Sequence, residues 1–148
     1  MEHEEYMRQA LELARLAMAE GEVPVGCVIV RDGAVVGRGR NRRETEHTAL
    51  GHAELDAIRQ ACGALGGWRL SRCALYVTLE PCPMCAGAIV NARIPAVYYG
   101  AKDDKAGCCG SVLNLFEERY GHHPAIYGGV LADDCAAALR AFFGGLRG

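Results

Sequence analysis

The sequence has no apolar run long enough to cross a membrane. None of its apolar stretches approaches the roughly 18 consecutive residues that a membrane-spanning helix needs. The N-terminal stretch, MEHEEYMRQALELARLA, is acidic and then amphipathic, whereas a secretory signal peptide starts with positive charge and continues with an apolar segment. These absences exclude a membrane-embedded protein and predict a cytoplasmic one.

The sequence also has no excess of positive charge. It carries 16 lysine and arginine residues against 18 aspartate and glutamate residues, which gives a formal net charge of −2. A domain that attracts nucleic acid through its overall field is expected to be basic. The stretch RGRNRR, residues 38–43, is a local exception, because its arginines surround Asn41. Two interpretations stay open for it, a solvated loop and a local phosphate-binding surface.

Nothing indicates a disulfide framework, although the chain has eight cysteines. A chain of 148 residues can bury a core without cross-links, and no export signal is recognisable, so reduced thiols or metal ligands are expected. Cys27, Cys73 and Cys135 lie in apolar stretches and are predicted to be buried. Cys108 and Cys109 lie in a glycine-rich loop, where a thiol could be exposed.

Hydropathy patterning predicts an α/β fold. Helical spacing of apolar residues predicts helices over 4–20, 52–63, 84–93 and 133–147, and a helical stretch near 111–119. Apolar and β-branched runs predict strands over 23–30, 34–40, 73–79, 96–100 and 125–131. Asp32–Gly33 is a typical hairpin turn, whereas the later strands alternate with helices and should be parallel. We therefore expect one domain over 1–148, a mixed five-stranded sheet with helices on both faces.

Two short motifs carry the chemistry. GHAEL, residues 51–55, places His52 two positions before Glu54 at a predicted helix start, and EPCPMC, residues 80–85, opens the next helix with Cys82 and Cys85. Imidazole and thiolates are typical zinc ligands, and a catalytic zinc site uses three protein ligands. Successive strand–helix units place helix starts along one edge of a sheet, so these residues can meet there.

Each motif alone has other interpretations. A Cys-x-x-Cys pair can be a redox centre, or part of a structural zinc site completed by Cys108, Cys109, His122 or His123. His-x-Glu alone is most often an ordinary helix start. The combination of His-x-Glu with Pro-Cys-x-x-Cys is different, because it is the signature of the zinc-dependent nucleobase deaminases. In that chemistry Glu54 would be the general acid and base.

The stretches around these motifs resemble the bacterial tRNA-specific adenosine deaminases of the cytidine/deoxycytidylate deaminase superfamily. The resemblance covers nearly the whole chain and is carried by EVPVGCVIV, GRNR, HAEL, LYVTLEPCPMCAGAIVNARI, YYGAKDDKAG and GGVLADDCAAALRAFF. It implies a three-layer α-β-α cytidine-deaminase-like fold. It also implies hydrolytic deamination of adenosine to inosine at the wobble position of a tRNA anticodon, by a homodimer that binds the anticodon stem-loop.

The resemblance further implies roles for individual residues. His52, Cys82 and Cys85 would hold one Zn2+ per subunit, and Glu54 would deprotonate the zinc-bound water and protonate the ring nitrogen and departing ammonia. Asn41 matches the asparagine that hydrogen-bonds the flipped base. Asp103 falls where the loop of the family meets the sugar–phosphate backbone next to that base.

Outside this core, Phe142 and Phe143 match an aromatic pair of the terminal helix, one of which would contact a flanking nucleotide. Arg40, Arg42 and Arg43 flank Asn41, so with the resemblance a phosphate-binding role for them is as well supported as a solvated loop. Two departures from the family pattern concern the substrate rather than the zinc chemistry. Gly51 directly before His52 could alter the pocket wall, and GCCG, residues 107–110, replaces what is commonly GAAG.

Two rival functions stay open. A deaminase of a free nucleobase or nucleotide, of the guanine or cytosine type, would share the same four core residues. A zinc-stabilised RNA-binding protein without activity would keep the fold, but it would have no use for the carboxylate of Glu54.

Overall fold

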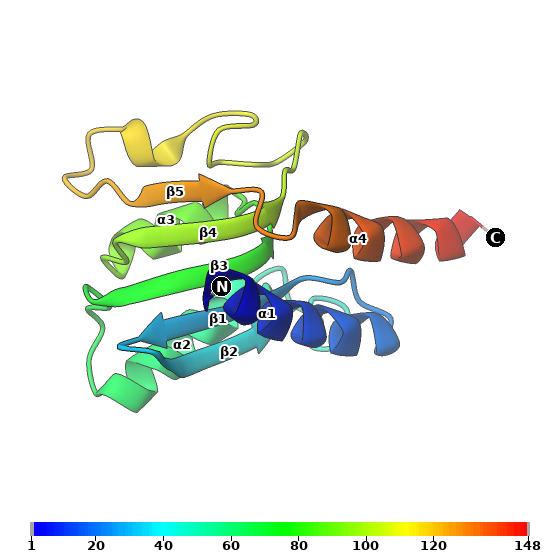
Figure 1. The fold of residues 1–148 in the computed structure, drawn as a ribbon, viewed down its shortest axis with the longest axis horizontal. Coiled ribbons are helices and arrows are strands. Elements are labelled where there is room, and N and C mark those ends of the chain that lie inside the picture. The colour runs from blue at the N-terminus through cyan, green and yellow to red at the C-terminus, as the bar shows by residue number, and fades with distance from the viewer. Residues whose placement is uncertain (1, 148) are drawn as a thin grey trace.

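The computed structural model describes residues 2–147. The helices and strands follow one another along the chain from blue to red in Figure 1. They are α1 (Glu2–Ala19), β1 (Gly26–Arg31), β2 (Ala34–Arg40), α2 (Ala53–Leu65), β3 (Cys73–Leu79), α3 (Pro83–Asn91), β4 (Ala96–Ala101), the short 3-10 helix η1 (Leu115–Glu117), β5 (Ala125–Gly128) and α4 (Ala132–Arg147). The predicted domain, 1–148, also includes Met1 and Gly148, which lie outside the described residues.

The strands form the predicted mixed five-stranded sheet, in the order β2-β1-β3-β4-β5. Strand β1 is antiparallel to both β2 and β3, whereas β3, β4 and β5 are parallel. The β1–β2 turn has positive φ angles at Asp32 (49°) and Gly33 (79°), which matches the right-handed twist of a two-residue hairpin. The predicted hairpin and parallel crossovers are therefore confirmed.

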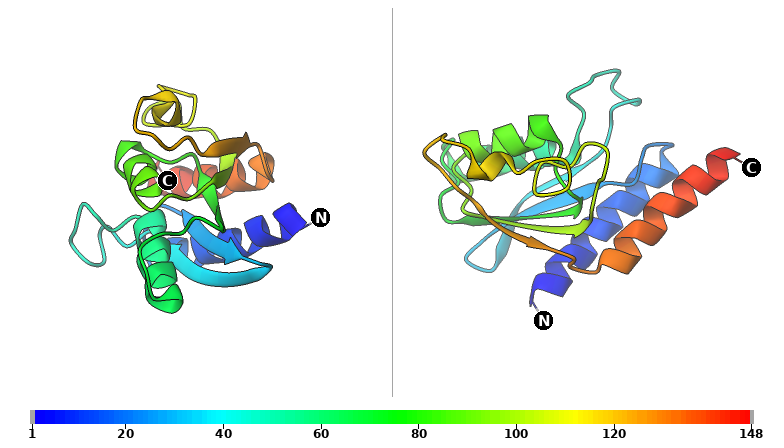
Figure 2. Two further views of the ribbon diagram at one scale, coloured as in Figure 1. Left: turned by 90° about the vertical axis from the view of Figure 1, so that its left-hand side faces the viewer. Right: turned by 90° about the horizontal axis from the view of Figure 1, so that it is seen from above.

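Helices cover both faces of the sheet, so the predicted three-layer α-β-α architecture is also confirmed. Figure 2 shows α1 and α4 side by side on one face, with α2 and α3 on the other. Each face buries its own apolar cluster, one represented by Ile29, Leu75 and Val97 and the other by Val28 and Tyr76. Because side chains alternate along a strand, neighbouring residues such as Val28 and Ile29 enter opposite clusters.

Two glycines of β2 allow α2 to lie directly on the sheet. A Cβ atom at Gly39 would overlap the carbonyl oxygen of Ala53, and one at Gly37 would overlap the carbonyl oxygen of Ala57. Any other residue type would push the helix away from the strand. This close approach fixes the first turn of α2, which carries Glu54, next to the end of β2.

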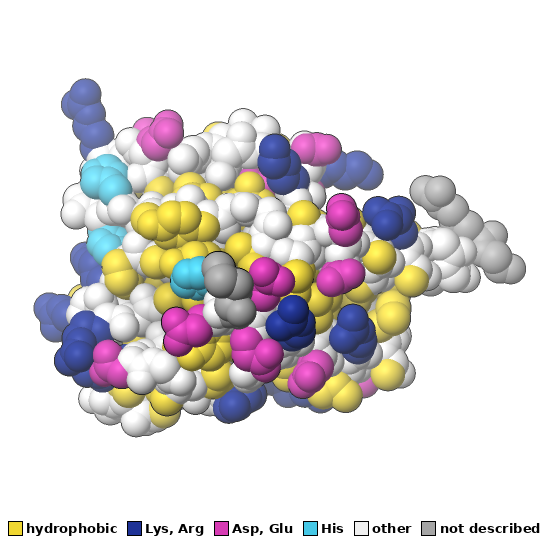
Figure 3. Space-filling view, viewed as in Figure 1, with side chains coloured by type: hydrophobic (Ala, Val, Ile, Leu, Met, Phe, Trp, Pro, Cys, Tyr) yellow, Lys and Arg dark blue, Asp and Glu magenta, His cyan; other side chains and the backbone are white. Residues whose placement is uncertain are grey.

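On the face that carries α1 and α4, the side chains that the structure describes form no continuous basic area. Figure 3 shows acidic and basic side chains interspersed over α1, beside an apolar area. Three rings form a stack, in which the ring centroids of His3 and Tyr98 are 4.4 Å apart and those of Tyr98 and Tyr127 are 4.7 Å apart. No helix within residues 2–147 is long and apolar enough to span a membrane.

The segment between β4 and β5 differs from its prediction. Of the helical stretch expected near 111–119, only η1 forms, with Asn114 accepting a hydrogen bond at its start. The amide of Leu115, which in that helix would donate to the carbonyl of Ser111, donates instead to the carbonyl of Cys108 at 3.0 Å. The amides of Cys109 and Ser111 donate to the carboxylate of Glu80, so the segment is held by bonds outside the expected helix.

The expectation of an accessible thiol in this loop was wrong. Cys108 is 1% exposed and Cys109 is 5% exposed, because the loop folds back onto the core. The amide of Cys108 donates to the carbonyl of Pro81 at 2.8 Å, which holds the loop in that position. Burial raises the pKa of Cys109 to about 12 and also raises the pKa of Cys108, so both are protonated thiols that pack as small apolar groups.

Candidate active site

The starts of α2 and α3 bring a histidine and two cysteines together at one end of the sheet. His52 is the N-cap residue of α2 and Cys82 the N-cap residue of α3, and neither side chain caps its own helix. The Nδ1 atom of His52 lies 3.6 Å from Sγ of Cys82 and 3.5 Å from Sγ of Cys85. Within residues 2–147 these three side chains form the group that could hold a metal ion, with their ligand atoms within 4.8 Å of one another.

The donor set and its electrostatics fit a thiolate-binding metal. Hydrogen bonds from the Cys85 thiol and from His52 lower the pKa of the Cys82 thiol to about 4. The pKa of Cys85 is raised, because its thiol donates to Cys82 and is buried. Cys82 is therefore a thiolate at neutral pH, which is the form that binds metal. One nitrogen and two sulfur ligands suit zinc, with a fourth position left for water or substrate.

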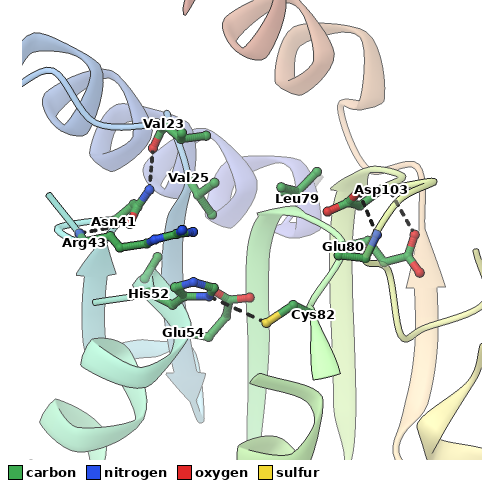
Figure 4. A pocket seen from close by; sticks show the side chains of 12 residues that line it. Val23, Val25, Asn41, Arg43, His52, Glu54, Leu79, Glu80, Cys82 and Asp103 are labelled. Atoms are coloured by element: carbon green, nitrogen blue, oxygen red, sulfur yellow. Dashed lines mark hydrogen bonds between the residues drawn. The ribbon is translucent and has the colours of Figure 1, made fainter. Parts of the chain in front are cut away.

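Glu54 lies on the first turn of α2, next to this group. Its side chain is only 4% exposed, and burial raises its pKa to about 7. A carboxyl group with a pKa near the working pH can both accept and release a proton during one reaction cycle. Figure 4 shows Glu54 beside His52 and facing the same pocket as Cys82.

The pocket is a cavity of about 220 Å³ at the ends of β2, β3 and β4. Asn41 and Arg43 line one wall and Asp103 lines the opposite wall, with Glu54 between them (Figure 4). This volume is below the roughly 300–1,000 Å³ of sites for drug-sized ligands, so it fits a single base better than a whole nucleotide. Apolar side chains, among them Val25, complete the lining.

The side-chain amide of Asn41 uses part of its hydrogen-bonding capacity within the protein. It is 8% exposed, its Nδ2 donates to the carbonyl of Val23 at 3.2 Å, and its Oδ1 accepts from the amide of Arg43 at 3.2 Å. An Asn side chain has two donor hydrogens and two acceptor lone pairs. One donor and one acceptor position therefore stay available to a ligand in the cavity.

The arginines next to Asn41 have different surroundings. Arg40 pairs with Glu20 at 2.7 Å, and Arg42 pairs with Asp56 at 2.7 Å. Within residues 2–147, the side chain of Arg43 makes no hydrogen bond or ion pair, and it lines the cavity. Of the three, Arg43 is placed to meet an anion at the cavity mouth.

Asp103 lies at the cavity wall but is also part of its own turn. Its Oδ1 accepts hydrogen bonds from the amides of Lys105 (3.1 Å) and Ala106 (3.2 Å). Its backbone amide donates to Oε1 of Glu80 at 3.1 Å. The second carboxylate oxygen of Asp103 is therefore left for a ligand.

The structure separates the other predicted residues from this site. Phe142 and Phe143 form an edge-to-face pair near the end of α4, with ring centroids 5.3 Å apart, and do not line the cavity. His122 hydrogen-bonds the carbonyl of Ile94, and His123 that of Phe116. These loop histidines hold the backbone, so the structural-zinc alternative finds no fourth ligand in them.

Sequence reasoning missed two buried carboxylates next to the cavity. Glu22 is 1% exposed and Glu80 is 2% exposed, and both accept hydrogen bonds from loops that are distant in sequence. The available signal was an acidic residue inside an otherwise apolar stretch, in GEVPV and in TLEPC. Such a residue is rarely buried without partners, so it marks a position where other groups converge.

The fold and the cavity together define a deaminase with the cytidine-deaminase-like fold. The MafB19-like deaminase family matches residues 1–132 of the chain. A solved structure from a study of A-to-I editing by tRNA:A34 deaminases at the wobble position of transfer RNA is similar, with a TM-score of 0.87 and 46% identity. The similarity covers 91% of this chain and 99% of that chain.

More distant in shape is a guanine deaminase from Bacillus subtilis, with a TM-score of 0.65 and 45% identity over 69% of this chain and 66% of that chain. The tRNA-specific adenosine deaminase of Bacillus subtilis is 50% identical over 143 residues, covering 96% of this chain and 89% of that protein. The chain therefore belongs to the tRNA-specific adenosine deaminase family.

Proposed function

We propose that this protein hydrolyses adenosine to inosine at the wobble position of a tRNA anticodon, with Glu54 as the proton carrier. The observation that carries the proposal is the buried carboxyl of Glu54 beside the ligand group of His52, Cys82 and Cys85, in a cavity of base size. Because tRNA is the proposed substrate, we expect the protein to act in the cytoplasm.

Zinc is the metal that the donor set favours. His52, Cys82 and Cys85 would hold one Zn2+ per chain, which when bound acidifies a water molecule enough for it to act as the nucleophile at neutral pH. The protein supplies the remaining chemistry through its own side chains. Apolar side chains such as Val25 and Leu79 at the cavity wall favour a flat aromatic base.

Glu54 moves the protons. It takes one proton from the attacking water as a bond forms between the water oxygen and the amine-bearing ring carbon, and it delivers that proton to the adjacent ring nitrogen. A second proton from the same water reaches the amine through Glu54, the carbon–nitrogen bond breaks, and ammonia leaves. The balance is adenosine plus water giving inosine plus ammonia. A carboxyl with a pKa raised to about 7 by burial suits both steps.

The cavity walls support recognition of the base and its backbone. The uncommitted donor and acceptor positions of Asn41 would bind the edge of the base. The free carboxylate oxygen of Asp103 would accept from a sugar hydroxyl, and the guanidinium of Arg43 would bind a phosphate. The base must leave its stack to enter the cavity, as in other enzymes that act on a base.

A second copy of the chain is the proposed partner at α3. This helix, PMCAGAIVN, has no charged residue, although Gly87 and Ala88 are only half-buried. Hollows flank the helix on both sides, one lined by Trp68 and the other by Tyr120, whose side chains are 50% and 61% exposed. An uncharged helix between two exposed aromatics is typical of a homodimer interface.

The dimer is tested by sedimentation. Ala88→Arg would place a charge on the outward face of α3 and is expected to give monomers. Leu16→Arg, on the exposed side of α1, is the control and is expected to stay dimeric. If the wild-type protein is a monomer at micromolar concentration, the homodimer is wrong.

The function is tested with an anticodon stem-loop that carries adenosine at the wobble position. After incubation with the zinc-loaded protein, inosine is read by sequencing as an adenosine-to-guanosine change. Glu54→Ala is expected to keep one zinc per chain and its fold while inosine formation is abolished. A fully active Glu54→Ala variant would overturn the mechanism.

A parallel assay measures ammonia release from free guanine, cytosine, adenine and their nucleosides. Deamination of small molecules alone, with the stem-loop untouched, would favour the free-base deaminase instead. Tight stem-loop binding without turnover of any substrate would favour a zinc-stabilised RNA-binding protein.

A further inference from the structure

Glu80 is a buried carboxylate that collects hydrogen bonds from one loop. It lies between the end of β3 and the metal-ligand turn, and it is 2% exposed. The loop is 102–111, which connects β4 to the segment before η1. The Glu80 carboxylate accepts four hydrogen bonds from this loop: from the amides of Asp103 (3.1 Å), Cys109 (2.9 Å) and Ser111 (3.1 Å), and from the Ser111 hydroxyl.

The four partners are all donors, so the geometry requires an acceptor-only group at this position. A carboxylate can accept at both oxygens, whereas an amide side chain would turn an NH2 group toward one set of donors. Within residues 2–147, Glu80 forms no salt bridge with an arginine or lysine. Its negative charge is therefore met by backbone and hydroxyl dipoles of a single loop.

Glycine at position 107 makes this arrangement possible. A Cβ atom at Gly107 would overlap the carboxylate of Glu80 and the carbonyl of Asp103. The loop backbone thus closes directly over the carboxylate. The amide of Cys108 donates to the carbonyl of Pro81 at 2.8 Å, which adds a backbone bond beside the side-chain bonds.

The same loop forms one wall of the cavity. Asp103 and Ala106 line the cavity, and one oxygen of the Asp103 carboxylate, Oδ1, accepts from the amide of Ala106. Figure 4 shows Glu80 and Asp103 joined across this wall, opposite Asn41. Two residues after Glu80, Cys82 enters the metal-ligand group. One side chain therefore ties the wall that would meet the sugar–phosphate backbone to the turn that carries a metal ligand.

We propose that Glu80 is a positioning residue for RNA recognition, which holds the loop 102–111 at the distance from the metal-ligand turn that the target nucleotide requires. Glu80 also lines the cavity, but both of its carboxylate oxygens are taken up by the loop, so it acts through Asp103. This inference rests on the proposed function for its substrate, but the ordering of the loop by Glu80 does not depend on that substrate.

The first test separates a local role from a general one by amide hydrogen exchange on the full-length, zinc-loaded protein. Glu80→Gln keeps the size of the side chain but places an NH2 group among donors. Faster exchange confined to 102–111, with β3 and α2 still protected, is expected. Faster exchange throughout the chain would show that Glu80 only stabilises the fold and would overturn the proposal. Unchanged exchange in 102–111 would overturn it as well.

The second test uses steady-state kinetics on the anticodon stem-loop. Glu80→Gln is expected to raise KM roughly tenfold or more, with kcat changed by less than about threefold and one zinc per chain retained. Ser111→Ala, which removes one donor and leaves the carboxylate, should raise KM in the same direction by less. A fall in kcat alone, or loss of zinc, would overturn the positioning role.

Glu117→Gln is the matched control, because Glu117 is an exposed carboxylate of η1. It is expected to leave KM, kcat and exchange unchanged. If Glu80→Gln does not fold, Ser111→Ala carries the same kinetic and exchange tests. If the wild-type protein does not act on the stem-loop, the proposed function fails, whereas the exchange test still decides whether Glu80 orders the loop.

Discussion

Thr45 donates both its backbone amide and its hydroxyl to one carboxylate oxygen of Glu22, each at 2.6 Å. The amide of Glu44 donates to the other oxygen at 3.1 Å. Glu22 thereby anchors the loop that follows Asn41, on the opposite side of the cavity from the loop that Glu80 anchors. Both walls of the cavity are held by a buried carboxylate rather than by regular secondary structure.

The pH dependence of stability should report on Glu22. Burial raises its pKa, but the hydrogen bonds from Thr45 and Glu44 outweigh burial, so the pKa is lowered below its ordinary value of 4.5. A carboxyl with a lowered pKa stabilises the fold above the unfolded pKa and loses that contribution as the pH falls through the folded pKa. We therefore expect Glu22→Gln to lower the free energy of unfolding by about 1–3 kcal/mol at pH 7.

Below pH 4.5 the difference between the wild type and Glu22→Gln should shrink, because the carboxyl of the unfolded chain takes up a proton there and the folded one does so at a lower pH. Urea unfolding at pH 7, 5 and 3.5 measures this convergence. Glu20→Gln is the control, since Glu20 is an exposed partner of Arg40, and it should lower stability much less than Glu22→Gln does at pH 7. A constant difference between wild type and Glu22→Gln at all three pH values would contradict the prediction.

Arg43 should account for more of the RNA affinity than Arg40, although the two are close in sequence. Arg40 is engaged by Glu20, whereas Arg43 lines the cavity without a partner among the described side chains. Arg43→Ala is expected to weaken stem-loop binding and to reduce the slope of log affinity against log salt by about one. Fluorescence anisotropy over a salt series gives both quantities. Equal slopes for Arg43→Ala and the wild type would exclude a phosphate contact.

Metal analysis should distinguish the ligands from the other thiols. His52→Ala and Cys82→Ala are expected to lose the zinc, because each removes one of three protein ligands. The double variant of Cys108→Ala and Cys109→Ala should keep one zinc per chain, since both thiols are buried in the core and neither belongs to the ligand group. Loss of zinc from this double variant would mean that the site is misassigned.

Chelation of the wild-type protein gives a second readout of the metal. Removal of zinc should abolish inosine formation and lower the melting temperature, because a metal that binds only the folded state stabilises it. Addition of Zn2+ should restore both. Unchanged activity after complete zinc removal would contradict the proposed chemistry.

The sequence specified the sheet better than the loops. The strand over 73–79 was predicted with its correct bounds, because a run buried on both faces followed by Pro81 leaves little ambiguity. The meeting of His52 with the two cysteines of EPCPMC also followed from the strand–helix order. These features depend on local patterns and on the rules of chain connection.

The loops depend on contacts that no local pattern contains. The helical stretch expected near 111–119 and the accessible thiol at 108–109 were both wrong. The carboxylate of Glu80 accepts from the amides of Cys109 and Ser111, and the carbonyl of Pro81 accepts from the amide of Cys108, so acceptors distant in sequence hold the loop against the core. Strand β5 likewise ends at Gly128, earlier than predicted, where positive φ angles at Gly129 and Leu131 turn the chain toward α4.

Gly51 is a further loop position whose role the structure explains. A Cβ atom there would lie 2.9 Å from backbone atoms of Arg42 and Arg43. The amide of Arg42 donates to the carbonyl of Gly51 at 2.9 Å, so the two segments cannot separate without loss of a hydrogen bond. Because residue 51 has no side chain, the backbone at Arg42 and Arg43 can pack directly against it, next to His52.

Gly51→Ala is therefore expected to push this cavity wall outward. The rigid backbone contact should cost about 1–3 kcal/mol of stability, as overpacking does elsewhere, and stem-loop turnover should fall while zinc content stays at one per chain. Gly63→Ala is the control: it lies inside α2 with open space around it, and it should stabilise the protein by about 0.5–1 kcal/mol. Thermal unfolding measures the stability of both variants, and inosine formation measures their turnover. A Gly51→Ala variant as stable and as active as the wild type would show that the loop can move away from residue 51 without consequence for the base-binding wall.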